Sequence, residues 1–442
     1  MRLFIFSFFT FFLLIISVES WAQNYQPESL IFPFQEQHVH GPSIVELPNG
    51  DLLAAWFQGT GERWADDVVI MGARLKKNET SWSEPFLMAD VPGFPDINPM
   101  MFIDSRGKLW LMWYTVLANQ WETSLPKYRI SSDYENEGTP RWEWQEVLHV
   151  KPGDKTERGI QPGDRFVTGI NQQFNEYEKY LEEVIFPSNP GLKEKYDEEW
   201  PAFRNMIDSL VNGNNQVRKG IIEKDGKSVT ARLGYPISRR LGWQTKNKPF
   251  ILNSKRLIVP LYSDGLECAL FAVTDDWGQA WQFSNPVIGG IGIQATIAIK
   301  KDGTLVAYLR DNGPPPYRIQ YTESKDNGLT WSIAKDTQLP NPGAGFDMVT
   351  MKNGNWLLIY NHTESGRFNL TAAMSDDEGK TWRWKKNLEN DLRKENATRF
   401  HYPAVIEGSD GTIHTVYSYH RNDTVPGKTI KWKSFKVKWL ME

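Results

Sequence analysis

Polar residues of kinds that bind and transform ligands recur at one end of apolar, strand-like segments in this 442-residue chain. Directly before such segments stand Gly41, Asn98, Lys248, Gln294 and Tyr402, and near the same ends stand His38, His40, Asp347, Asn361 and His362. Histidine and tyrosine can exchange protons with a substrate, while amide and charged groups can hold it. A structural hydrogen bond would explain any one of them equally well, but packing hardly explains the set. The pattern therefore predicts a ligand pocket.

A repeated unit must position these residues. It is a tight turn followed by alternating apolar residues that end in an aromatic side chain, as in Asn49 and Gly50 ahead of Leu52 and Trp56. Asn-Gly and Asp-Gly before a period-2 pattern are strong hairpin signals. Six copies occur, at a period of about 50 residues. This favours an all-β chain folded as a six-bladed β-propeller, in which strand ends from every blade meet around one axis.

A second motif, Ser/Thr-x-Asp-x-Gly-x-x-Trp, occurs at residues 274–281, 324–331 and 375–382. The Asp and Ser or Thr side chains can bond to turn amides, the glycine can take a positive φ, and the tryptophan can pack on the sheet. A ligand loop is not needed several times over. We therefore interpret the motif as a structural clip that recurs from blade to blade.

The gap between the second and third units is longer than one repeat. Within residues 150–235, apolar side chains at helical spacing, such as Phe174 and Leu181, predict a helix that ends at Pro187. A second helix is expected to begin with Pro201 in its first turn. We interpret this region as a partly helical insertion between blades 2 and 3, which serves as a lid, a substrate wall or decoration.

Charge and the N-terminal residues limit the partners and the compartment. The formal net charge of −4 argues against a nucleic acid or an anionic membrane as partner. Residues 1–22 combine a basic start, an apolar run and small residues before Gln23, as a cleavable signal peptide does. We expect the mature chain, residues 23–442, to begin near Gln23, to be secreted or periplasmic, and to lack a membrane span. A membrane anchor is the alternative for that run.

The repeats and clips together resemble the sialidase superfamily, most closely the bacterial BNR-repeat (Asp-box) proteins, over nearly all of residues 35–439. Sialidases are six-bladed propellers with the active site at the centre of one face. The resemblance thus implies an exported exo-glycosidase that hydrolyses a terminal acidic sugar, sialic acid or a related one, from a glycan or polysaccharide. It implies no cofactor.

The motifs of that superfamily carry over residue by residue. Arg310 and Arg367 match the second and third arginines that bind the substrate carboxylate, and Tyr402 matches the nucleophile. Either Asp66 or Asp67 matches the acid/base aspartate. The resemblance therefore assigns catalysis to these aspartates and Tyr402, and substrate binding to the two arginines.

Two positions depart from the superfamily pattern. His40 stands where the first arginine belongs, and Gln294 replaces the glutamate that partners the tyrosine. A phenol is a weak nucleophile unless a neighbouring base takes its proton. Gln294 cannot do so, and His40 is the candidate base. The altered pocket leaves open a sugar other than sialic acid.

Further side chains are candidates for substrate contact: Glu62, Arg63, Gln294, Asp347, Asn361, Arg240 and Trp243. Arg240 and Trp243, at the end of the insertion, would equally fit a salt-bridged rim. His38 and His40 lack further ligands at zinc spacing, so no metal site is predicted. Two other functions remain: a hydrolase or lyase for a uronic-acid-containing polysaccharide, with Tyr402 and His40 as acid and base, and a non-catalytic glycan-binding propeller.

Overall fold

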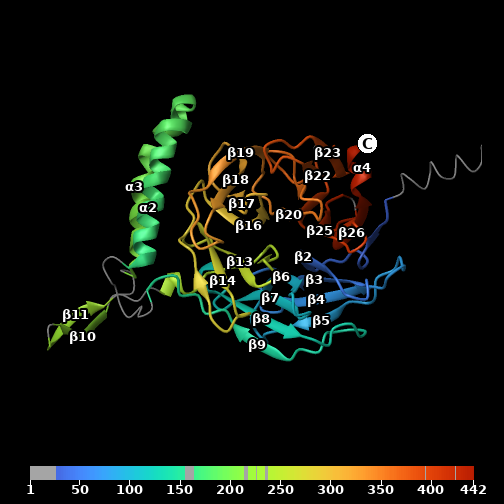
Figure 1. Ribbon diagram of the computed structural model, residues 1–442, viewed down its shortest axis with the longest axis horizontal. Helices are drawn as coiled ribbons and strands as arrows, with labels where there is room; N and C mark the ends of the chain where they lie inside the picture. The colour runs from blue at the N-terminus through green and yellow to red at the C-terminus, as the bar shows by residue number, and fades with distance from the viewer. Residues whose placement is uncertain are drawn as a thin grey trace, which may run out of the picture.

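A computed structural model describes residues 26–154, 164–213, 218–224, 226–233, 237–393, 395–423 and 425–442. Six four-stranded antiparallel sheets form a ring (Figure 1), which confirms the six-bladed propeller. The predicted signal peptide, residues 1–22, lies outside the described residues. In the part of the chain that is described, no helix has both the length and the apolar character needed to cross a membrane.

Three blades come first along the chain, and in each blade the strands follow one another outward from the axis in chain order. Blade 1 contains β2 (His38–Glu46), β3 (Leu52–Gly59), β4 (Val69–Leu75) and β5 (Phe86–Ala89). Blade 2 contains β6 (Asp96–Ile103), β7 (Leu109–Val116), β8 (Ser124–Ser131) and β9 (Trp144–Val147). Blade 3 contains β12 (Phe250–Leu252), β13 (Arg256–Ser263), β14 (Cys268–Thr274) and β15 (Gln282–Phe283).

The remaining blades close the ring. Blade 4 contains β16 (Gly292–Ile299), β17 (Leu305–Asp311), β18 (Arg318–Ser324) and β19 (Lys335–Pro340). Blade 5 contains β20 (Asp347–Thr350), β21 (Trp356–Tyr360), β22 (Asn369–Ser375) and β23 (Trp384–Asn390). Blade 6 contains β24 (Arg399–Glu407), β25 (Thr412–Arg421), β26 (Gly427–Lys436) and the N-terminal β1 (Glu28–Leu30), and α4 (Val437–Met441) follows it. Since β1 pairs with β26, strands from both ends of the chain complete this blade.

The clip motif forms the predicted turns. In the copy at residues 324–331, Asp326 accepts hydrogen bonds from Ser324 Oγ (2.9 Å) and from the backbone N–H of Thr330 (2.8 Å). Gly328 has a φ of +88°, and the buried Trp331 packs against the ring of Phe271 in the neighbouring blade. The three clips join third to fourth strands, so they lie on the face opposite the starts of the inner strands. They are structural.

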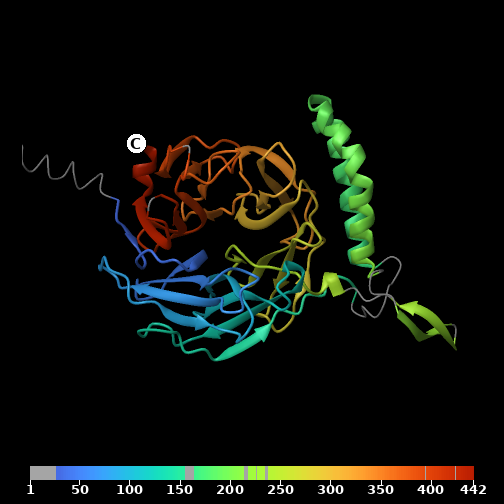
Figure 2. The ribbon, with the colours of Figure 1, turned by 180° about the vertical axis from the view of Figure 1, so that it is seen from behind.

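The insertion lies between blades 2 and 3, as predicted, and Figures 1 and 2 show its helices standing beside the ring. It consists of α2 (Arg165–Tyr180), the helical turns η2 (Leu181–Ile185) and η3 (Phe186–Ser188), α3 (Pro190–Val211), the hairpin β10 (Arg218–Lys224) and β11 (Lys227–Leu233), and η5 (Ile237–Arg239). The prediction for the second helix was wrong, because α3 begins at Pro190 and contains Pro201. Pro190 occupies the first turn, where its missing N–H costs nothing. The side chains around Pro201 pack on α2, and this packing compensates for the backbone hydrogen bond that Pro201 cannot donate.

Candidate active site

β-Bulges direct side chains toward the propeller axis. The inner strands β2, β6, β16 and β24 each shift register near their starts. At these shifts lie Gly41, Asn98, Gln294 and Tyr402, with φ values of +59°, +50°, +53° and +54°. A positive φ is rare for a side chain as large as tyrosine and marks a conformation imposed by its surroundings. A Cβ at Gly41 would lie 2.5 Å from Asn98 Oδ1, so that position requires glycine.

The phenolic oxygen of Tyr402 is the centre of the resulting cluster. Arg310 Nη1 donates to it at 2.7 Å and Gln294 Nε2 at 3.1 Å. Gln294 Nε2 also lies 3.1 Å from the Tyr262 hydroxyl, which fixes the amide. Two N–H donors stabilise negative charge that develops on this oxygen when it loses its proton or attacks. The structure thus brings together three of the predicted residues.

Three cations surround the ring of Tyr402. Lys246 Nζ lies 5.3 Å from its centroid, and the guanidinium carbons of Arg310 and Arg367 lie at 5.9 and 5.8 Å. Burial lowers the pKa of Lys246 to about 8. Sequence reasoning missed Lys246, although it lies two residues before Lys248 and so on the same side of an extended segment. This charge pattern suits an anionic ligand.

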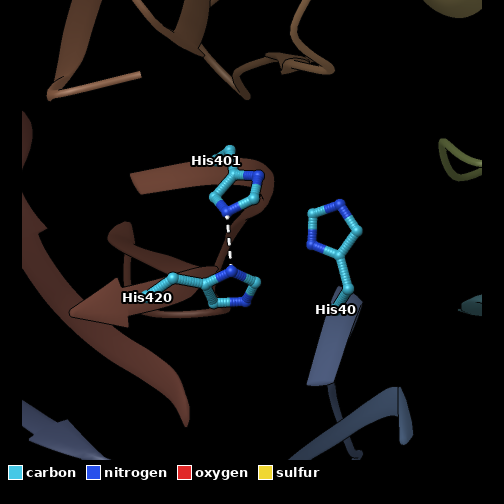
Figure 3. Close-up of side chains that lie close together, drawn as sticks. All are labelled: His40, His401 and His420. Atoms are coloured by element: carbon cyan, nitrogen blue, oxygen red, sulfur yellow. Dashed lines mark hydrogen bonds between the residues drawn. The ribbon is translucent and has the colours of Figure 1, made fainter. Parts of the chain in front are cut away.

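Arg367 is hydrogen-bonded to His401, which is bonded in turn to His420 of the same blade, as Figure 3 shows for the two histidines. Its Nη1 lies 2.9 Å from His401 Nδ1, and its Nη2 donates to Gly343 O at 2.8 Å. His401 Nε2 lies 3.3 Å from His420 Nδ1, and His420 Nε2 lies 2.8 Å from Val39 O. Since the arginine must donate and the carbonyl must accept, each imidazole accepts a hydrogen bond at Nδ1 and donates one from Nε2. We infer neutral tautomers from this network.

His40 faces that pair from β2, as Figure 3 shows. Its Nδ1 lies 2.7 Å from Ser418 Oγ, and its ring centroid lies 4.1 Å from that of Tyr402. Burial, followed by the nearby His420 and His38, holds the pKa of His40 well below its usual value. The imidazole is therefore neutral at pH 7.

His40, His401 and His420 are also the one group in the described part of the chain that could hold a metal, with ligand atoms within 4.8 Å of one another. In this arrangement both nitrogens of His401 and of His420 are already hydrogen-bonded. A metal would have to displace these bonds beside the Arg367 cation. The geometry fits a hydrogen-bonded network that holds Arg367 better than a metal centre.

The histidine network predicts a pH-dependent stability. Burial lowers the pKa of His420 to about 4, so between pH 6.5 and 4 only the unfolded chain takes this proton. Stability then falls with falling pH by about 1.4 kcal/mol per pH unit for one such histidine. We expect the difference in unfolding free energy between the native chain and His420→Gln to shrink at that rate from pH 6 to pH 4.5 in urea titrations. The raised pKa values of Glu267 and Asp336 make the folded chain more stable as the pH falls, but both proteins contain these groups, so their effect cancels in the difference.

His149, whose side chain is 69% exposed, provides the matched control. A His149→Gln substitution should leave the difference constant with pH. An equal pH dependence for both variants would contradict a buried, neutral His420.

The loop between β3 and β4 places its acidic residues at different depths. Glu62 reaches inward, and its Oε1 lies 3.1 Å from His38 Nε2. Asp66 and Asp67 are exposed: Asp66 accepts from Asn119 Nδ2 at 3.0 Å, and Asp67 binds the backbone and hydroxyl of Thr60. None of the hydrogen bonds recorded for either aspartate involves Tyr402. The structure therefore brings Glu62 to the histidines and leaves both aspartates on the outer loop.

Two aromatic rings flank Arg63 in the same loop. Its guanidinium carbon lies 5.5 Å from the Trp64 ring and 4.9 Å from the Trp121 ring. Trp64 is 62% exposed. Because the loop lies on the face where inner strands begin, these side chains lie on the same face of the propeller as the Tyr402 cluster.

Asp347 and Asn361 have structural contacts. Asp347 accepts from Lys248 Nζ (2.5 Å), Thr296 Oγ1 (3.1 Å) and the backbone N–H of Val405 (2.9 Å). Asn361 Nδ2 donates to the backbone oxygens of Asn369 and Phe400. Both side chains are buried, and their prediction as substrate contacts is corrected to a role in holding blades together.

The two residues predicted to contact substrate from the end of the insertion, Trp243 and Arg240, differ in exposure. Trp243 is 0% exposed, with its Nε1 donating to Arg239 O at 2.7 Å and its ring against Phe166. A buried indole cannot contact a glycan, so this prediction was wrong. The loop position of Trp243 suggested a side chain exposed to solvent, but the insertion covers it. Arg240 follows η5 and is partly exposed.

The fold and the cationic pocket together define a sialidase-like β-propeller. Residues 50–158 and 236–415 match the BNR repeat-like domain family, and the chain belongs to that family. The anhydrosialidase of Macrobdella decora is 25% identical over 218 residues, which are 42% of this chain and 27% of the leech enzyme. The match thus spans about a quarter of that relative.

Solved structures show the same fold. A Dyadobacter fermentans protein of unknown function has a TM-score of 0.60 at 13% identity, covering 92% of this chain and 97% of its own. The leech intramolecular trans-sialidase, complexed with 2,7-anhydro-Neu5Ac, has 0.56 at 14%, covering 94% and 71%. The NanB sialidase of Streptococcus pneumoniae has 0.54 at 14%, also covering 94% and 71%. At these identities the likeness concerns the fold alone.

Proposed function

We propose that this protein is an exported exo-glycosidase of the sialidase type, which hydrolyses a terminal acidic sugar, sialic acid or a related one, from a glycan. The observation that carries the proposal is the set of three cations, Lys246, Arg310 and Arg367, around the ring of Tyr402. Such a pocket favours a sugar that carries a carboxylate next to its reacting carbon.

Substrate binding in this proposal uses the arginines as a fork. Arg310 and Arg367 hold the carboxylate through charge-assisted hydrogen bonds, the geometry in which guanidinium groups are strongest. His40 occupies the place of the first sialidase arginine and is neutral, so Lys246, in the segment before blade 3, supplies the third positive charge from across the axis. Arg63, Trp64 and Trp121 contact the glycan beyond the terminal sugar.

Bond cleavage then needs a nucleophile, a base and an acid. The Tyr402 oxygen attacks the anomeric carbon, or shields a water that does, and its proton passes to His40 as the glycosidic C–O bond breaks. Arg310 and Gln294 stabilise the charge on the phenolic oxygen. A carboxylic acid of the outer loop, Asp66 or Asp67, protonates the leaving oxygen. Glu62 orients the histidines through His38.

A fluorogenic aryl sialoside tests this function. We expect turnover by the native chain and a value of kcat/KM about tenfold lower in Lys246→Met, mainly through KM, because one partly desolvated charge is lost. Lys352, which bonds to backbone oxygens of Gly408 and Ser409 on the opposite face, provides the control as Lys352→Met. No release from any acidic glycoside, in the presence of a folded protein, would contradict the proposal.

One observation favours a second candidate. The neutral His40 packs on Tyr402, and the glutamate that would assist a nucleophile is absent at Gln294. A histidine base and a tyrosine acid next to arginines also suit a hydrolase or lyase for uronic-acid-containing polysaccharides. A rise in ultraviolet absorbance from unsaturated uronate products would select the lyase. Glycan binding without turnover would select the non-catalytic propeller.

A further inference from the structure

A partly open aromatic cavity of about 320 Å³ lies between the helical insertion and the rim of blade 4. The helices contribute Tyr177, Tyr196, Trp200 and Phe203, while propeller loops contribute Gly290 and Pro315. This cavity is separate from the Tyr402 cluster, and neither the family nor the proposed function assigns it a role. It is the site where the insertion and the propeller meet.

The aromatic wall is built in advance of any ligand. The rings of Tyr196 and Trp200 stack at 4.6 Å with planes inclined by 26°, and Phe174 meets Trp200 edge to face at 5.4 Å. Trp200 Nε1 and Arg204 Nη1 both donate to Glu178 Oε1 at 2.7 Å. That carboxylate holds the indole by its polar edge, so the ring face that Tyr196 does not cover can meet a ligand.

Polar groups of the cavity lack partners. Gln320 is 2% exposed, and its Nε2 donates to Gly290 O at 2.9 Å, but its Oε1 and the Tyr196 hydroxyl have no hydrogen-bond partner among the described residues. Buried polar groups are almost always hydrogen-bonded, so an unpaired acceptor indicates a missing donor. A donor from a bound molecule would satisfy Gln320.

The charge of the cavity is negative. Lys195 lies 3.9 Å from Glu199, so these two lining residues offset each other. Glu267 and Asp336 also line the cavity, and the described residues offer neither of them an ion-pair partner within 4 Å. Burial raises the pKa of Glu267 to about 7 and that of Asp336 to about 6. Both carboxylates would gain from a buried cation.

We propose that this cavity binds an organic cation with an apolar body, such as a substituted ammonium. The aromatic faces of Tyr196 and Trp200 attract the positive charge, and Glu267 and Asp336 neutralise it. Where the cation carries an N–H, Gln320 Oε1 accepts it. The apolar body occupies the space between α2, α3 and Pro315.

The cavity adjoins the candidate active site through one segment. Ile291, which lines the cavity, accepts the backbone N–H of Asn312 at 3.1 Å, and Asn312 Oδ1 accepts from Arg310 Nη2 at 3.0 Å. Two hydrogen-bonded residues, Ile291 and Asn312, therefore connect an occupant to Arg310. The cation site itself does not depend on the proposed glycosidase function.

Isothermal titration with phenyltrimethylammonium and with N,N-dimethylaniline, which is uncharged at pH 8, tests the proposal. At that pH, above the pKa of both carboxyls, we expect the cation to bind at least tenfold more tightly than its neutral analogue. Glu267→Gln and Asp336→Asn should each weaken the cation by about three- to tenfold and leave the analogue unchanged. Trp200→Leu should remove binding of both.

Two variants serve as controls. Asp376→Asn alters an acid of a clip on the opposite face and should leave cation binding unchanged. Tyr402→Phe should also bind normally, which separates this site from the glycosidase proposal. Equal affinity for the cation and the neutral analogue, absence of cation binding, or full affinity in both carboxyl variants would overturn the proposal. The carboxyl variants conserve size, so they decide the question even if Trp200→Leu does not fold.

Discussion

Tyr402→Phe is expected to lower kcat/KM for an acidic glycoside by at least about 1000-fold, or roughly 4 kcal/mol of transition-state stabilisation. The substitution removes the one oxygen on which Arg310 and Gln294 converge, while Gln294 keeps its contact with the Tyr262 hydroxyl. Arg367 and Lys246 remain, so binding of the free acidic sugar should persist. Initial rates with a fluorogenic glycoside and titration with the sugar product measure the two effects separately.

Tyr134→Phe is the matched control for this experiment. Its hydroxyl is hydrogen-bonded too, but it donates to the Gly107 carbonyl at 2.8 Å, in a turn on the opposite face. We expect native activity from it. Comparable rates in Tyr402→Phe and the native chain would exclude Tyr402 from the chemistry and leave the histidines as the reacting groups.

Asp347→Ala is expected to reduce the free energy of unfolding by about 2–4 kcal/mol, because it leaves the Lys248 ammonium without its partner and removes the acceptor of the Val405 amide. The lower part of the usual range applies because the Lys248 side chain is 24% exposed. This one carboxylate connects blade 5 to Thr296 of blade 4, Val405 of blade 6 and the segment before blade 3. Urea-induced unfolding followed by tryptophan fluorescence measures the change.

Glu137→Ala is the control for stability. Glu137 also pairs with a lysine, Lys76 at 2.7 Å, but both side chains are largely exposed. Exposed pairs contribute little, so the unfolding midpoint should not move. If Asp347→Ala behaved in the same way, the carboxylate would not be what holds the four blades at the axis.

The propeller was predictable because its signals are local. Turn glycines such as Gly50 recur in five of the six blades, alternation such as that of Leu52–Gly59 recurs with them, and a clip needs only eight residues to form. The positions of Gln294 and Tyr402 followed from the same register. Each of these inferences needed only a short stretch of chain.

The rest of the site depends on contacts between distant segments. His401 and His420 meet His40 only when blade 6 closes on blade 1, and Lys246 reaches Tyr402 across the axis from blade 3. Trp243 occupies a loop position, but the insertion buries it. A single sequence contains no local signal for such contacts. For this reason the candidate active site was predicted in part and its histidine network was not.

The pairing of β1 with β26 has a consequence for the order of folding. Glu28 lies opposite Lys433 in that sheet, so the first strand to leave the ribosome must wait for the last before its backbone groups are paired. Blades 1 to 5 can assemble from neighbouring segments, whereas blade 6 needs a contact of nearly maximal sequence separation, and such contacts form slowly. Until then β26 presents an open sheet edge, a feature that favours aggregation. We therefore expect ring closure to be a slow step of folding during which the chain is prone to aggregate.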